Sequence, residues 1–180
     1  MNYYSAKELA ESFRTVRKNT LLIAQEIPEE QYGFRPAPDT RSVGDVLAHL
    51  ALSHKFQYQM ATERRTTLVG FDFSSLLKRF VAEEKEPRTK DQILEMLRTS
   101  GETWGEFLQG LTEDFLGEQV QMPPGMTPAS KSRFEMVLSV KEHEMHHRGQ
   151  LMLMERLIGI VPHMTREMQS RMAAAAAAKG

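Results

Sequence analysis

The sequence contains no cysteine. Disulfide bonds, thiolate metal sites and cysteine nucleophiles are therefore excluded, and any metal ion must be held by nitrogen and oxygen atoms. No apolar run approaches the length that spans a membrane, and the first residues lack the basic-then-apolar order of a signal peptide. We therefore expect a cytoplasmic protein without a membrane partner.

An excess of charge of either sign is also missing. The 180 residues include 23 basic and 24 acidic ones, so the formal net charge is -1. This balance gives no broad positive field for a nucleic-acid backbone, and we expect no nucleic-acid partner. No internal repeat or linker divides the chain. We expect one helical domain over residues 1–165 and an alanine-rich tail over residues 166–180.

The sequence is rich in apolar residues at helical spacing. Their spacing predicts four long helices, with approximate ranges 6–27, 43–65, 90–111 and 128–158. The expected N-terminal caps are Ser5, Thr40 or Ser42, Thr89, and Thr127. A short helix over residues 74–84 is expected in the connection between the second and third long helices. With no convincing strand pattern, the sequence predicts an all-α four-helix bundle.

Two histidines share one face of the predicted fourth helix. His143 and His147 are four residues apart, so both imidazoles can point at one ion. The rest of that face is apolar apart from Gln150, so it should point into the bundle. Buried histidines need either hydrogen-bond partners or a metal ion, and these two residues alone do not decide between the alternatives.

His49 on the second helix favours the metal. It lies among apolar residues of its own helix, so it should also face the interior. Three inward histidines on two helices match the three protein ligands of a catalytic metal site, in which water or substrate takes the remaining position. The sequence therefore predicts a divalent metal site formed by His49, His143 and His147. Imidazole suits zinc, copper, iron and nickel alike, so the metal is not identified.

Residues 143–147 also fit the pattern H-E-x-x-H of zinc peptidases. In that reading Glu144 would serve as the general base. A peptidase also needs a substrate-aligning strand, which is not predicted, and a third ligand, typically downstream. The only downstream acid in range is Glu167, beyond Pro162. Peptidase activity is therefore not favoured.

The segments "FRPAPDTRSVGDVLAHL" and "HEMHHRGQL" resemble the DinB/YfiT-like family of proposed metalloenzymes. The resemblance covers most of the chain, and its most specific part is the ending "HHRGQL". It implies an up-down-down-up four-helix bundle with a long crossover connection. It also implies one divalent ion, often nickel or zinc, on His49, His143 and His147. Members of this superfamily include transferases and isomerases that use bacillithiol, mycothiol or glutathione, and dimers are common.

Three functions stay open at this stage. The first is a metal-dependent transferase in which a low-molecular-weight thiol attacks a small electrophilic substrate, with Gln150 orienting a ligand. The second is a metal-dependent hydrolase with Glu144 as base. The third is a metal-binding stress-response module without catalytic activity. A homodimer is plausible if apolar residues such as Phe71, Phe73 and Trp104 are exposed.

Overall fold

The computed structural model describes residues 4–178 of the chain. Its longest helices are α1 (Ala6–Glu26), α5 (Lys90–Gln109) and α7 (Arg133–Leu157). The shorter elements are the 3-10 helix η1 (Glu29–Gln31), the helices α2 (Val43–Leu52), α3 (Lys55–Thr62), α4 (Phe73–Glu84), α6 (Glu113–Gly117) and α8 (His163–Ala177), and the strands β1 (Gln119–Gln121) and β2 (Ser130–Ser132). None of the described helices is both long and apolar enough to cross a membrane.

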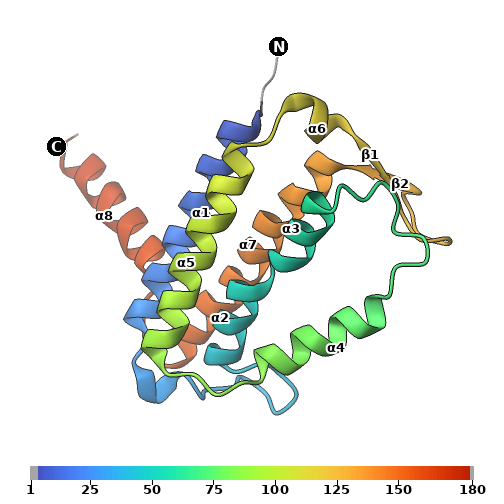
Figure 1. Cartoon of the computed structure of the whole chain (residues 1–180). Helices are drawn as coiled ribbons and strands as arrows, with labels where there is room; N and C mark the ends of the chain where they lie inside the picture. Colours follow the sequence, from blue (N-terminus) through green and yellow to red (C-terminus); the bar gives the residue numbers. More distant parts are fainter. Residues whose placement is uncertain (1–3, 179–180) are drawn as a thin grey trace.

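The predicted four-helix bundle is confirmed (Figure 1). Helix α1 packs between α5 and α7, and α2 with α3 completes the bundle on the other side of these two helices. Helices α1 and α7 run in one direction, whereas α2, α3 and α5 run in the opposite direction. Parallel neighbours require a crossover, and α4 lies within that long connection. The topology is therefore up-down-down-up.

Each of the four bundle segments begins with a capping box, in which a cap hydroxyl and the side chain three residues later satisfy free backbone amides. The pairs are Ser5 with Glu8, Ser42 with Asp45, Thr89 with Gln92, and Ser132 with Glu135. The first three agree with the caps expected from the sequence. Helix α1 ends at its cap Ile27, and α7 ends just before Gly159, whose φ is +87°. Both helix ends lie where the sequence predicts them.

The predicted second helix is interrupted at Ser53 and His54, so it forms α2 and α3. In an unbroken helix the carbonyl of Leu50 would accept a hydrogen bond from the amide of His54. Here that carbonyl accepts from the hydroxyl of Ser53 at 3.0 Å and from the guanidinium of Arg17 at 3.2 Å. Competition for one acceptor therefore accounts for the break.

The expected start of the fourth helix at Thr127 is wrong. Residues 119–121 and 130–132 instead pair as a short antiparallel hairpin, with Gln119 opposite Ser132. Helix α7 begins only after this hairpin, at the cap Ser132. The sequence prediction failed because three-residue strands carry too little alternation to be recognised.

Trp104 is fully buried, and its ring stacks on Phe107 with centroids 5.2 Å apart. Trp104 therefore does not meet the condition of exposure under which the sequence predicts a homodimer. Phe71 is partly buried, whereas 40% of Phe73 is exposed. The homodimer stays a prediction.

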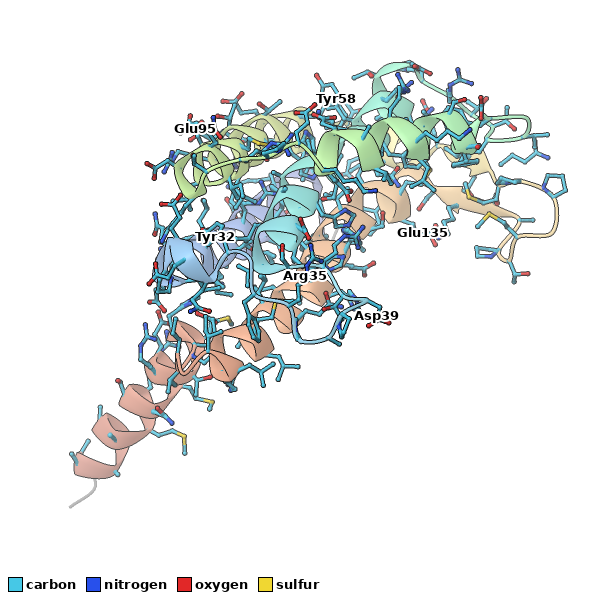
Figure 2. The ribbon with its side chains drawn as sticks, turned by 90° about the horizontal axis from the view of Figure 1, so that it is seen from below. Tyr32, Arg35, Asp39, Tyr58, Glu95 and Glu135 are labelled. Carbon is cyan, nitrogen blue, oxygen red and sulfur yellow. The ribbon has the colours of Figure 1, made fainter. Side chains whose placement is uncertain are left out.

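Helix α8 includes most of the segment expected as a tail. It projects away from the bundle in both views (Figures 1 and 2). Its first residue, His163, is buried, and its Nε2 lies 3.2 Å from Oδ1 of Asn19. Beyond His163 most side chains of α8 are exposed. The helix is therefore attached to the bundle mainly at its start.

Candidate metal centre

The structure brings His49, His143 and His147 together. Their Nε2 atoms form two close pairs, 3.1 Å between His49 and His143 and 3.2 Å between His147 and His143. One ligand nitrogen from each of the three lies within 4.8 Å of the others. Helix α2 supplies one imidazole and α7 supplies two, as their helical faces predict.

These distances fit a metal ion. Bonds of about 2.0–2.1 Å at tetrahedral angles place two ligand nitrogens roughly 3.3 Å apart, close to both observed separations. Two neutral imidazoles can also approach this closely through one N–H···N hydrogen bond, but three nitrogens directed at one point are the arrangement that an ion requires. The donor set therefore suits a divalent ion that accepts imidazole, and leaves coordination positions for other ligands.

Contacts at the opposite ring nitrogens keep two of these histidines in place. Nδ1 of His147 lies 2.7 Å from the side-chain oxygen of Gln150, to which an Nδ1–H can donate. Nδ1 of His49 contacts the carboxylate of Glu84 on α4. Such contacts fix the tautomer in which Nε2 is free to bind a metal ion, and they increase its basicity.

Glu84 was not predicted as a site residue. It comes from α4, 35 positions away from His49 along the chain, and no spacing rule connects the two. Its other carboxylate oxygen lies 3.3 Å from the guanidinium of Arg41, in the loop before α2. Arg41 and Glu84 thus extend the centre from the bundle to the crossover connection. Figure 2 shows the same loop from below, with Arg35 and Asp39 labelled.

Gln150 contacts two histidines of α7. Its amide oxygen is taken by His147, and its amide nitrogen lies 3.2 Å from Nε2 of the exposed His146. These contacts position His147. That Gln150 also orients a bound ligand stays a prediction. Gln150 lies four residues after His146 and three residues after His147 on α7. Both spacings bring side chains together on a helix, so the sequence signals these two contacts.

The structure does not place Glu144 with the three histidines. The side chain is fully buried, and both of its oxygens accept hydrogen bonds from Arg17, at 2.8–3.1 Å. Both oxygens of this carboxylate are thus committed to a buried ion pair and are not directed at the histidines. The expectation that Glu144 acts as a base therefore lacks support from the geometry. Asp45, one turn before His49 on α2, is engaged by Arg35 and by its own capping box.

Burial, together with the neighbouring His147 and His49, lowers the pKa of the His143 imidazole to about 4. Burial also lowers the pKa of His147, although the hydrogen bond with Gln150 opposes that change. Both rings are therefore neutral at pH 7. Neutral imidazole is the form that binds a metal ion.

The comparisons with known proteins agree with this geometry. The family model described as the DinB superfamily matches residues 12–151, which include all three histidines. The chain belongs to the DinB superfamily. The expected resemblance is thereby confirmed, and the expected DinB/YfiT-like fold is confirmed by the solved structures.

Two Bacillus subtilis relatives illustrate the likeness. The uncharacterized protein YjoA is 22% identical over 157 residues, which cover 86% of this chain and 91% of YjoA. The crystal structure of YjoA, a DinB-like protein, has a TM-score of 0.62 at 21% identity, covering 84% of this chain and 92% of that one. The structure of YfiT, described as a probable metal-dependent hydrolase with an unusual four-helix bundle topology, has a TM-score of 0.67. Its identity is 14%, over 89% of this chain and 91% of YfiT. At such identities the solved structures establish the fold.

Proposed function

We propose that this DinB-superfamily chain is a metal-dependent enzyme that transfers a low-molecular-weight thiol to a small electrophilic substrate. The observation that carries the proposal is the convergence of three Nε2 atoms from His49, His143 and His147 on one point. A divalent ion at that point would supply Lewis-acid chemistry, lowering the pKa of a coordinated thiol or water.

The other residues of the site favour a reaction that needs no general base from the protein. Among the described residues, Glu144 is bound to Arg17 and Glu84 is bound to His49 and Arg41. A thiol that has already lost its proton requires no such base. Its sulfur forms a bond to the electrophilic carbon, the leaving group departs with its electron pair, and the thiol proton passes to solvent.

A hydrolase is the second candidate, because YfiT is described as a probable metal-dependent hydrolase. Here water would replace the thiol as nucleophile, and the same histidines would hold the ion. The metal could be nickel or zinc under either proposal, and neither requires Glu144.

The two reactions can be separated directly. Metal-loaded protein is assayed for consumption of chlorodinitrobenzene with bacillithiol, mycothiol or glutathione, and for hydrolysis of a panel of nitrophenyl esters without thiol. We expect thiol-dependent turnover that the variant His147→Ala lacks. Ester hydrolysis without a thiol requirement would favour the second candidate. No turnover in either assay by protein that holds one ion per chain would contradict both and favour a non-enzymatic binding module.

A further inference from the structure

A cavity of about 490 Å³ opens beside the histidine cluster. His49 and His143 form part of its wall, so a molecule in the cavity would lie next to the point where the three Nε2 atoms meet. Its volume is in the range of small-molecule sites. A larger cavity of about 750 Å³ lies beside α5 and contains none of the three histidines. The smaller cavity is therefore the better candidate for the substrate of this centre.

The wall of this cavity is predominantly apolar. Its apolar side chains come from all the surrounding helices: Leu52, Phe56, Phe73, Leu76, Leu77, Phe80 and Val140. Phe73 and Leu77 of α4 are 40% and 62% exposed, so α4 presents apolar groups that the fold does not bury. A bound apolar group would remove part of this surface from water, at about 25 cal/mol per Å².

Charge is scarce in the wall. Among the described residues that line the cavity, Glu84 is the only ionisable one apart from the histidines. Its carboxylate is already engaged by His49 and Arg41. An anionic group in the apolar part would therefore find no free cation among the lining residues, and its desolvation would oppose binding.

The polar groups of the wall can accept hydrogen bonds but have few hydrogens left to donate. The hydroxyl of Ser139 donates to the carbonyl of Met136 at 2.6 Å, and that of Ser53 donates to the carbonyl of Leu50 at 3.0 Å. The Ser139 oxygen can then only accept a hydrogen bond. The side-chain amide of Gln57 must therefore turn its nitrogen, and not its oxygen, toward Ser139, and the two atoms are 3.5 Å apart. The Gln57 oxygen Oε1 is buried and has no hydrogen-bond partner.

We infer that this cavity binds a neutral substrate with an aromatic or branched apolar body and one hydroxyl or amide hydrogen, which is donated to Oε1 of Gln57 when that amide turns from its 3.5 Å contact with Ser139 toward the cavity. The inference rests on the proposed function, because it takes the cavity as the substrate site of the histidine centre. The apolar wall selects the body of the substrate. The unpaired oxygen of Gln57 selects the polar end of the substrate, because a buried acceptor without a hydrogen-bond donor is unfavourable.

Three aromatic probes test the inference in chelator-treated protein. They are 2-phenylethanol, its methyl ether, which has no donor, and phenylacetate, which is anionic. Their Kd values are measured by titrations followed by protein NMR. We expect 2-phenylethanol to bind, the ether to bind roughly three- to tenfold more weakly because one hydrogen bond is lost, and phenylacetate to bind weakest.

Variants assign the binding to this cavity. The substitution Gln57→Leu should abolish the difference between alcohol and ether, and Phe80→Ala should weaken both. Leu153→Ala, at an exposed apolar position of α7 outside the cavity, should change neither. Equal binding of the alcohol and the ether to the wild type, or tighter binding of phenylacetate, would overturn the inference. So would probe binding that Phe80→Ala leaves unchanged.

The variant His147→Ala separates this inference from the proposed function. His147 is one of the three converging histidines but does not line the cavity. We expect His147→Ala to lose the ion and keep the Kd for 2-phenylethanol within about twofold of the wild type. Loss of probe binding in this variant would show that the cavity does not bind the probe independently of the metal-binding histidines, and would count against the inference. Probe binding by a wild-type chain that takes up no ion when it is loaded with nickel or zinc would leave the cavity assignment standing and contradict the proposed function.

Discussion

The guanidinium of Arg17 lies 2.8 Å from the carboxylate of Glu144, and both side chains are almost completely shielded from solvent. The same guanidinium donates to the carbonyls of Leu50 and Leu97 and to the hydroxyl of Ser100. One arginine on α1 therefore connects α2, α5 and α7. This network lies within the bundle, whereas His49 and His143 border the cavity beside α4.

Removal of Glu144 should destabilise the fold more than it affects metal binding. The variant Glu144→Ala leaves the buried charge of Arg17 without its partner, which costs about 3–5 kcal/mol in the free energy of unfolding. Denaturant titration measures the loss, and elemental analysis measures the metal content. We expect a large decrease in stability with one ion per chain retained. A stable Glu144→Ala protein that has lost its ion would instead place Glu144 at the centre.

The contact between Glu84 and His49 should strengthen metal binding. The variant Glu84→Gln keeps the shape of the side chain but weakens the hydrogen bond that orients the imidazole, so metal affinity should fall roughly 10–100-fold. Competition with a chelator measures the affinity. The neighbouring Glu83, which pairs with Lys55, provides the matched control Glu83→Gln. Equal affinities in the two variants would argue against the orienting role.

Two glycines within helices should respond oppositely to alanine. A Cβ atom at Gly101 would lie 2.8 Å from Cγ of Arg17, whereas one at Gly149 would meet nothing within 4 Å. The variant Gly101→Ala should therefore lose about 1–3 kcal/mol through overpacking. Gly149→Ala should gain about 0.5–1 kcal/mol, because alanine favours the helix. Thermal or denaturant unfolding tests both, and a stabilised Gly101→Ala protein would contradict the close packing at Arg17.

Glu155 should make stability depend on pH. Burial, with a smaller effect of the nearby Glu26, raises the pKa of its carboxyl to about 7, and neither oxygen has a hydrogen-bond partner. Between pH 4.5 and 7 the folded chain therefore binds more protons at Glu155 than the unfolded chain, and this site reduces stability as the pH rises. Well above pH 7 the full penalty, on the order of 3 kcal/mol, is present.

The substitution Glu155→Gln should remove that penalty. Compared with the wild type, the variant should be more stable at pH 8, and the advantage should shrink toward pH 4.5. Denaturant titrations across this pH range measure the difference. Parallel stability profiles for the two proteins would show that Glu155 does not titrate as its environment indicates.

The sequence predicts much of this fold because its signals are local. Capping boxes at Ser5 and Thr89 and apolar stripes at helical spacing depend only on neighbouring residues. The break between α2 and α3 depends on Arg17, 33 positions from the carbonyl of Leu50 that it binds. The hairpin before α7 likewise depends on pairing between residues separated along the chain.

The same distinction holds at the candidate metal centre. Histidines four residues apart on one helix are visible in the sequence, and the apolar face around His49 indicates that it points inward. The ion pair of Glu144 with Arg17 and the contact of Glu84 with His49 span 127 and 35 positions, so no local pattern reveals them. The sequence therefore identifies the converging imidazoles but not the groups that hold them in place.

Metal content is the most direct test of the central claim that His49, His143 and His147 form one metal site. Protein purified without a chelating column is compared with the three single alanine variants and with His146→Ala, whose imidazole is adjacent on α7 but exposed. Elemental analysis should find one divalent ion per chain in the wild type and in His146→Ala, and far less than one in each of the other three. A full complement of metal in any of those three variants, or none in the wild type after loading with nickel or zinc, would contradict the claim.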